Sequence, residues 1–167
     1  MIACVDVHYV DDFAVAACVL FREWTHGRCV DRLTARVEGV APCEPGRFIK
    51  RELKPLLAVL GQVPVALRTV VVDGYVWLDA ADTPGLGAHL YRALAEKVPV
   101  VGVAKHRFGD AGFAVRVLRG QSVRPLYVTA AGMSLRRAAG CILRMHGPDR
   151  LPTMIRMADR LSRTPCP

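Results

Sequence analysis

Three apolar runs rich in β-branched residues fill most of the first 37 positions and constrain the fold more than any other feature. They span Ile2–Val7, Phe13–Phe21 and Arg28–Val37, and turn-forming residues separate them at positions 11–12 and 25–27. Short apolar runs bounded by Asp, Thr and Gly are typical of strands. We therefore predict an antiparallel meander at the start of the chain.

After the meander, apolar runs alternate with stretches of helical periodicity. The sequence predicts four further strands, at Leu67–Val72, Val98–Ala104, Phe113–Leu118 and Leu126–Thr129. It predicts helices over Phe48–Leu60, Leu86–Lys97, Leu135–His146 and Met154–Ser162, the last two with Ser134 and Thr153 as N-caps. This alternation indicates an α/β fold, a mixed sheet flanked by helices, and the absence of any linker pattern predicts one domain over 1–167.

Basic residues are concentrated in the second part of the chain. Residues 101–167 hold 12 Lys and Arg against 3 Asp and Glu, whereas residues 1–100 hold 11 against 12. Eleven of the late cations are arginine, whose planar guanidinium matches phosphate oxygens. This half indicates a polyanionic partner such as nucleic acid, or else a solvated basic surface.

The sequence also excludes several classes of protein. Its longest uncharged apolar run, Phe13–Phe21, is far shorter than the ~20 residues that span a bilayer, so we expect no membrane partner. No basic segment precedes Asp6, which argues against a secretory signal and for a cytoplasmic protein. The 6 cysteines form no C-x-x-C pair and fit buried thiols. The Gly85-Leu86-Gly87 motif follows no strand, so no nucleotide cofactor is expected.

Ionisable residues follow three of the apolar strand-like runs. Asp6, Asp73 and Lys105 stand at the carboxyl ends of the runs that begin at Ile2, Leu67 and Val98. In α/β sheets, sites form where parallel strands end, so these three side chains are candidates to converge. Each also has a structural interpretation; for Asp73-Gly74 it is a hairpin turn.

Glu52 is a fourth candidate because it falls within the apolar stripe of the predicted helix Phe48–Leu60. A carboxylate in that position is costly unless it is paired, hydrogen-bonded or bound to a metal. Pro55 leaves an alternative open, since a helix that restarts there would put Glu52 at a solvated junction or beside Arg51.

Together, Asp6, Glu52 and Asp73 would form an oxygen-only set of ligands. Hard oxygen ligands select Mg²⁺ or Mn²⁺, and such an ion can activate water against a phosphodiester. With Lys105 to stabilise charge on the phosphate, the set is typical of a metal-dependent nuclease.

Eight motifs, in order along the chain from Ile2 to about Ser162, resemble those of the endonuclease V family. They are Asp6-Val7-His8-Tyr9, Pro45-Gly46 leading to Arg51-Glu52, Val72-Asp73-Gly74, Gly85–Leu90, Pro99–Lys105, Arg124–Val128, Arg150-Leu151-Pro152 and Arg156–Asp159. The resemblance implies a ribonuclease-H-like fold and a Mg²⁺-dependent endonuclease of DNA repair that cuts near inosine (deaminated adenine), at the second phosphodiester on its 3′ side.

The same resemblance assigns roles to residues. It implies that Asp6 and Asp73 ligate the metal, that Glu52 completes the acidic cluster, and that Lys105 faces the scissile phosphate. It further implies a set of substrate-binding positions: Tyr9, Cys43, Pro45, Gly46, Gly74, Asp79, Gly132 and Met133.

The chain departs from the family pattern in four places. It reaches Asp6 without the family's extra N-terminal helical segment, and Cys43 stands where the family carries a tyrosine that wedges the strands apart. Asp79 or Ala80 replaces a histidine after the Asp-Gly motif, and Met133 replaces another. Losing the tyrosine removes an aromatic face worth ~1–3 kcal/mol per stacked base.

Two other functions stay open beside the inosine-directed enzyme. The chain is alternatively a non-catalytic homologue that binds DNA or RNA through its arginine-rich half, or a nuclease of the same fold with another substrate, such as a structured junction or RNA. The retained Asp6, Glu52, Asp73 and Lys105 favour an enzyme.

Overall fold

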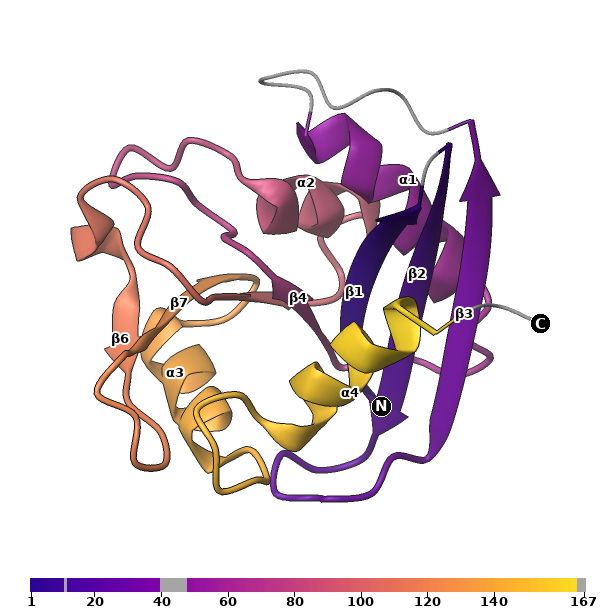
Figure 1. The fold of residues 1–167 in the computed structure, drawn as a ribbon. Helices are drawn as coiled ribbons and strands as arrows, with labels where there is room; N and C mark the ends of the chain where they lie inside the picture. The colour runs from indigo at the N-terminus through magenta and orange to yellow at the C-terminus, as the bar shows by residue number, and fades with distance from the viewer. Residues whose placement is uncertain (11, 40–47, 165–167) are drawn as a thin grey trace.

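The computed structural model describes residues 1–10, 12–39 and 48–164. In this part of the chain, the strands form a 7-stranded mixed sheet with the order β3-β2-β1-β4-β5-β7-β6 (Figure 1). The strands are β1 (Ile2–Val10), β2 (Phe13–Phe21), β3 (Asp31–Glu38), β4 (Thr69–Asp73), β5 (Val100–Ala104), β6 (Val115–Val117) and β7 (Leu126–Ala131). The predicted meander is confirmed, because β1 pairs antiparallel with β2 and β2 with β3.

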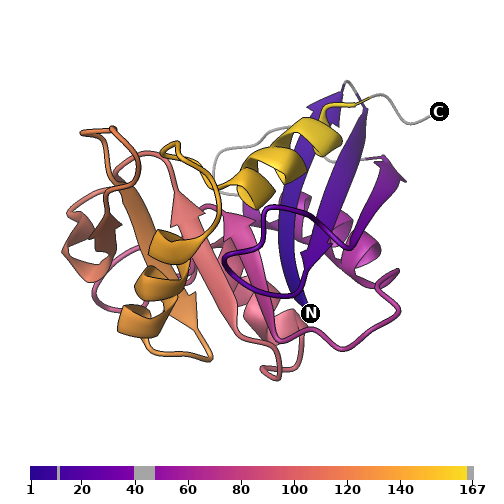
Figure 2. The ribbon, with the colours of Figure 1, turned by 90° about the horizontal axis from the view of Figure 1, so that it is seen from below.

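Helices cover both faces of the sheet (Figure 2). They are α1 (Phe48–Leu60), α2 (Leu86–Ala93), α3 (Leu135–Arg144) and α4 (Thr153–Ser162), with a short 3₁₀ turn, η1, at Ala111–Phe113. α1 and α2 pack on one face, whereas α3 and α4 pack on the other. The predicted α/β class is confirmed.

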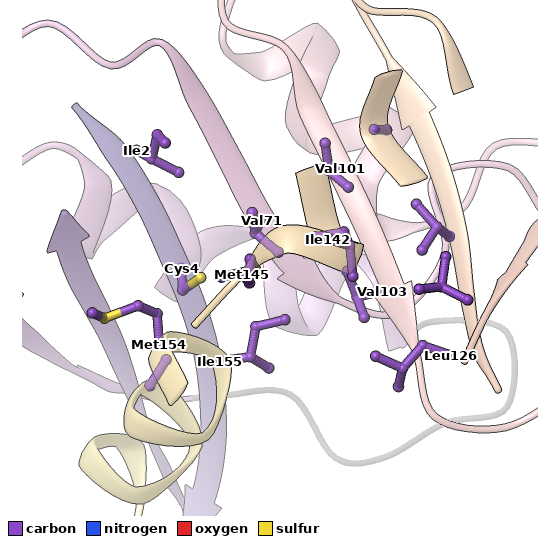
Figure 3. Close-up of a cluster of buried hydrophobic side chains, with 14 of the residues drawn as sticks. Ile2, Cys4, Val71, Val101, Val103, Leu126, Ile142, Met145, Met154 and Ile155 are labelled. Carbon is purple, nitrogen blue, oxygen red and sulfur yellow. The ribbon is translucent and has the colours of Figure 1, made fainter. Parts of the chain in front are cut away.

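Alternation along the strands builds the two cores. In β1, Ile2 and Cys4 point toward α3 and α4, and the neighbouring Ala3 and Val5 point toward α1 and α2. The first of these cores includes Ile142 of α3 and Met154 and Ile155 of α4 (Figure 3). Because the central strands are buried on both faces, their sequences are nearly continuous apolar runs.

Several predicted ends differ from the structure. α2 ends at Ala93 instead of Lys97, because Ala95 and Glu96 take left-handed backbone conformations with φ of 55° and 58°. α3 ends at Arg144, since Met145 is extended. The predicted strand Phe113–Leu118 is reduced to Val115–Val117 because Phe113 belongs to the 3₁₀ turn.

Of the two predicted helix caps, one is confirmed and the other is wrong. The Ser134 hydroxyl accepts a hydrogen bond from the Arg137 N–H, as a cap does. The prediction for Thr153 is wrong: Pro152 occupies the cap position, and the Thr153 hydroxyl instead lies 3.0 Å from Nδ1 of His146.

α1 runs without interruption through Pro55. Proline removes only the hydrogen bond that its own nitrogen would make to the turn before it, and the buried faces of Leu56 and Val59 hold the helix on the sheet. The alternative of a new helix at Pro55 is therefore wrong, and Glu52 lies in the middle of a continuous helix.

The described helices are all too short or too polar to form a membrane span.

Candidate active site

Three neighbouring central strands bring three of the predicted catalytic residues to the same end of the sheet. β1 pairs parallel with β4, with Val5 opposite Val72, and β4 pairs parallel with β5. Asp6 and Asp73 therefore stand side by side, directly after the last residue pair between β1 and β4. The prediction that Asp6 ends its strand is wrong, because β1 continues to Val10 and Asp6 pairs with Ala17 of β2. Lys105 follows the end of β5 directly.

These residues line a pocket of about 460 Å³. Asp6, Asp73 and Lys105 enter it from the sheet, and Glu52 enters it from α1. Asp159 and Arg163, on α4 and just after it, close the opposite side. The pocket thus collects the four catalytic candidates from four separate segments of the chain.

The backbone beyond β4 turns away across β5 and forms no hairpin. Gly74 takes φ of 129°, a conformation that favours glycine. The Val76 N–H then donates to the Thr129 hydroxyl oxygen at 2.8 Å. A Cβ on Gly102 would lie 2.6 Å from the Gly74 carbonyl oxygen, so only glycine in β5 leaves room for this crossing. The hairpin interpretation of Asp73-Gly74 is wrong.

Lys105 and Asp73 form an ion pair at the mouth of the pocket. The ammonium Nζ lies 2.5 Å from Oδ2 of Asp73, and each side chain is 28% exposed. Burial by itself lowers the pKa of Lys105, but the Asp73 carboxylate outweighs it and leaves the pKa raised. Arg150 fixes the strand end by donating to the Lys105 carbonyl and, at 2.9 Å, to the Pro125 carbonyl.

Asp6 is anchored by a residue of α4. The Ser162 hydroxyl, which is 1% exposed, donates to Oδ2 of Asp6 at 2.7 Å. Burial raises the pKa of Asp6, the Ser162 hydrogen bond opposes that rise, and the nearby Asp73 and Asp159 charges add to it. Asp159 accepts a hydrogen bond from Arg163 at 3.0 Å.

Glu52 experiences the strongest electrostatic strain in the pocket. Burial, followed by the charges of Asp6 and Asp73, raises its pKa to about 8, against the opposing effect of Arg51. A cation between these carboxylates would relieve the same repulsion. The pocket is therefore a place where the protein gathers negative charge at a cost in stability.

A family model described as Endonuclease V matches residues 1–114. The chain belongs to the endonuclease V family. Solved structures agree: endonuclease V from Streptomyces avermitilis is 30% identical with a TM-score of 0.79, covering 97% of this chain and 79% of that one.

Human endonuclease V is 27% identical with a TM-score of 0.74, over 97% of this chain and 82% of the human one. Endonuclease V from Ciona intestinalis, solved with a 24mer DNA containing an inosine, has a TM-score of 0.79 at 22% identity, over 97% of this chain and 84% of that one. The ribonuclease-H-like fold class is thereby confirmed. A comparison with curated protein sequences gives no match.

The oxygen-rich donor set of the pocket suits the hard divalent cation expected of an endonuclease V. Asp6, Glu52 and Asp73 offer only carboxylate oxygens, the chemistry that Mg²⁺ and Mn²⁺ prefer. Within the described residues, no three His, Cys, Asp or Glu side chains already stand close enough together to enclose an ion. Small rotations of the carboxylates, including release of Asp73 from Lys105, would accompany binding.

The structure places only some of the predicted substrate-binding residues of this endonuclease V chain near the pocket. Gly74 lines the pocket. Tyr9 lies beyond Asp6 on β1, with the Arg51 guanidinium carbon 3.8 Å from its ring centre. Cys43, Pro45 and Gly46 lie outside the described residues.

Asp79, Gly132 and Met133 do not line the pocket. The Asp79 carboxylate accepts hydrogen bonds from the N–H groups of Ala81 and Thr83 and so closes a turn. Gly132 and Met133 follow Ala131, the last residue of β7, which pairs with the first residue of β5. They therefore lie at the opposite end of the strands from the pocket. Their roles in substrate binding stay predictions.

Several residues in or beside the pocket were not predicted from the sequence. Ser162 and Arg163 follow Asp159 by three and four positions, a helical spacing that puts them near the same side of α4. Tyr75 holds the loop after Lys105 by donating to the His106 carbonyl and accepting from the Phe108 N–H. The helical spacing was available as a signal in the sequence, but the Tyr75 contacts were not.

Proposed function

We propose that this chain is a divalent-metal-dependent endonuclease that hydrolyses phosphodiester bonds in nucleic acid near inosine. The observation that carries the proposal is the convergence of Asp6, Glu52, Asp73 and Lys105 in one pocket. A set of three carboxylates beside a lysine suits phosphodiester hydrolysis, because the carboxylates hold a cation and the lysine offsets charge on the phosphate.

Each residue has a distinct task in this proposal. Asp6 and Asp73 hold Mg²⁺ or Mn²⁺, and Glu52 completes the set as a ligand or as the group that orients water. When bound, the cation supplies a Lewis acid for the phosphate and lowers the pKa of water. The Ser162 hydrogen bond favours the ionised form of the Asp6 carboxylate and fixes its orientation.

Lys105 changes partners between the free protein and the complex. In the free protein its ammonium is paired with Asp73 at 2.5 Å. If Asp73 held the cation instead, the ammonium would be free to face the scissile phosphate, where it would stabilise the additional negative charge of the transition state. Arg150 keeps the Lys105 backbone in place during this change.

Inosine as the recognised lesion is supported by family membership and by the inosine-containing DNA in the Ciona intestinalis structure. The Cys43 and Met133 substitutions concern recognition of the lesion, whereas the four catalytic candidates concern the chemistry. A loss of lesion preference would therefore leave cleavage itself intact.

The test is cleavage of end-labelled oligonucleotides that carry either inosine or adenine at one position, with Mg²⁺, Mn²⁺ or EDTA. We expect a metal-dependent cut on the 3′ side of inosine. Equal cutting of both oligonucleotides would remove the inosine preference but keep the nuclease. Binding without cleavage of any DNA or RNA substrate would instead identify a nucleic-acid-binding homologue.

An Asp73→Asn variant tests the assigned site. It should lower the cleavage rate about a thousandfold, since it removes one charged ligand, while it keeps or tightens binding by removing negative charge near phosphate. Asp82→Asn is the matched control, because Asp82 is exposed on a turn with φ of 59° that asparagine also tolerates. Parent-like cleavage by Asp73→Asn would show that the site is assigned wrongly.

A further inference from the structure

A second groove of about 310 Å³ lies beside α4, on the side of the helix that faces β3. It is lined by Arg32, Thr153, Arg156, Met157, Arg160, Leu161 and Thr164. α4 packs across β1 and β2 (Figure 2), so its outer edge runs along the neighbouring strand β3. None of these lining residues belongs to the catalytic pocket.

A stripe of arginines joins this groove to the catalytic pocket. Arg156, Arg160 and Arg163 are spaced four and three positions apart, so they lie on one side of the helix. Arg163 lines the catalytic pocket, and the other two line the groove. A rise of ~1.5 Å per residue separates Arg156 from Arg163 by about 10 Å, which is about three nucleotide steps of ~3.4 Å in a duplex strand.

The lining of the groove has the chemistry of a phosphate site. Three arginines and two threonines line it beside Met157 and Leu161, and within the described part of the chain no Asp or Glu lines it. Arg156 is paired with Asp149, and Arg163 with Asp159 by an exposed ion pair. Exposed ion pairs contribute little to stability, so exchanging these carboxylates for phosphate costs little.

We propose that this groove holds the phosphodiester backbone of the substrate as it leaves the catalytic pocket. The proposal rests on the proposed function, because the pocket defines where the strand starts. An acidic protein segment would also suit guanidinium groups, but the continuity of the stripe with the catalytic pocket favours the strand that is being cut. Arg160 and Arg156 then contact phosphates within about three nucleotides of the pocket, and Arg32 lines the other side of the same groove.

The test compares oligonucleotides of two lengths, each with a fluorescent label and one inosine. A short strand of about three nucleotides, inosine included, is too short to reach beyond the pocket, whereas a strand of about twenty also reaches the groove. In an Asp73→Asn background, Arg160→Glu and Arg32→Glu should each weaken binding of the long strand about tenfold and leave the short strand unchanged. For single strands, the salt slope of binding should fall by ~0.7 for each lost phosphate contact.

Matched controls separate a local contact from a general effect of charge. Arg92→Glu makes the same charge change on α2, which covers the other face of the sheet, and should leave both affinities at the parent value. Arg160→Gln removes the contact without adding repulsion and should show a smaller loss, again confined to the long strand. Parent-like binding of the long strand by Arg160→Glu, or an equal loss for both lengths, would overturn the proposal.

The result is independent of the inosine assay. If the proposed function fails and no substrate is cut, the length-dependent binding of the parent protein still tests the groove. If the groove proposal fails, cleavage of the short inosine strand persists. Ribose and deoxyribose versions of the long strand identify which polymer the groove accepts, and the length-dependent loss with either one supports the proposal.

Discussion

Two regions of this molecule bury charged side chains, and they differ in the partners that the protein provides for the charge. Arg119 follows β6, is 6% exposed, and lies against the connection between α3 and α4. Its guanidinium donates to the backbone carbonyls of Leu143, Met145, Gly147, Asp149 and Arg150. The protein therefore supplies every partner that this cation needs.

The catalytic pocket does the reverse with its carboxylates. Asp6 and Glu52 are partly buried next to Asp73, and the pKa of each is raised, first by burial and then by like charge. A buried charge with partners inside the protein is tolerated by the fold and costly to strip of those partners, whereas crowded charges of one sign destabilise the fold until a ligand binds. The difference separates a structural charge from a functional one by physical criteria alone.

The largest expected effect comes from the pocket. Lys105→Met should lower kcat for cleavage about a hundredfold to a thousandfold, because it removes a preorganised cation from the transition state. The free energy of unfolding should change little, since the lost ion pair is partly exposed. Lys54→Met, on the exposed side of α1, is the control, and steady-state kinetics are the measurement; an unchanged kcat would contradict the proposed role of Lys105.

Arg119→Met should have the opposite signature. It leaves several buried carbonyls without donors and should lower the free energy of unfolding by about 3 kcal/mol. Urea unfolding measures this loss, with Arg116→Met on the exposed side of β6 as the control. If both variants lose the same stability, the carbonyl contacts of Arg119 are not what holds the α3–α4 connection.

Glu52→Gln tests whether the pocket destabilises the fold. In the metal-free protein, Glu52 keeps its proton up to a pKa of about 8, whereas in an unfolded chain a glutamate has an ordinary pKa of 4.5. The folded state thus binds more protons in this window, so stability falls as pH rises through it. Glu52→Gln should remove that slope and raise stability by about 2 kcal/mol at pH 8.

Thermal unfolding in EDTA across this pH range is the measurement for Glu52→Gln. The glutamine keeps the size of the side chain and removes only its charge, so packing is preserved. A parent-like slope in the variant would mean that another group causes the pH dependence.

The smallest expected effect is at Ser162. Ser162→Ala removes the hydroxyl that donates to Asp6 and should lower the free energy of unfolding by about 1 kcal/mol. The pKa of Asp6 should rise further, because its ionised form loses a hydrogen bond. The acidic limb of the pH–rate profile should then move to higher pH; an unmoved limb would show that Asp6 does not depend on Ser162.

The strands and helices were predictable wherever local pattern and burial agree. β2, β4, β5 and residues 2–5 of β1 are buried on both faces, so their sequences are mostly apolar. Element ends were less accurate where the backbone conformation decides them, as at Ala95, Glu96 and Thr153. These positions depend on left-handed conformations and on a contact with His146, and no local pattern encodes either.

The residues of the candidate site also fall into those that local sequence pattern predicts and those that only tertiary contacts place. Asp73 and Lys105 were predictable because each stands at the end of a buried strand, where sites of parallel sheets form. Asp6 was predicted on the same ground, but β1 continues to Val10, and Asp6 reaches the site because the pairing of β1 with β4 ends beside it. Glu52 was ambiguous, since only the packing of α1 on the sheet decides that the helix continues through Pro55. The contacts of Ser162 with Asp6 and of Arg150 with the Lys105 carbonyl span long sequence separations and follow only from tertiary structure.

By itself the sequence determined the α/β class, the family and the residue types available for catalysis, because hydrophobic periodicity and ordered motifs are written locally along the chain. Tertiary structure alone decided that β1, β4 and β5 lie parallel with their carboxyl ends together. It also decided that the arginines of α4 continue from the pocket into a second groove. Strand order and helix placement depend on packing between residues far apart in the sequence. That packing brings Glu52 close to Asp6 and Asp73, which raises its pKa. It also places the groove proposed for the phosphate backbone beside the pocket.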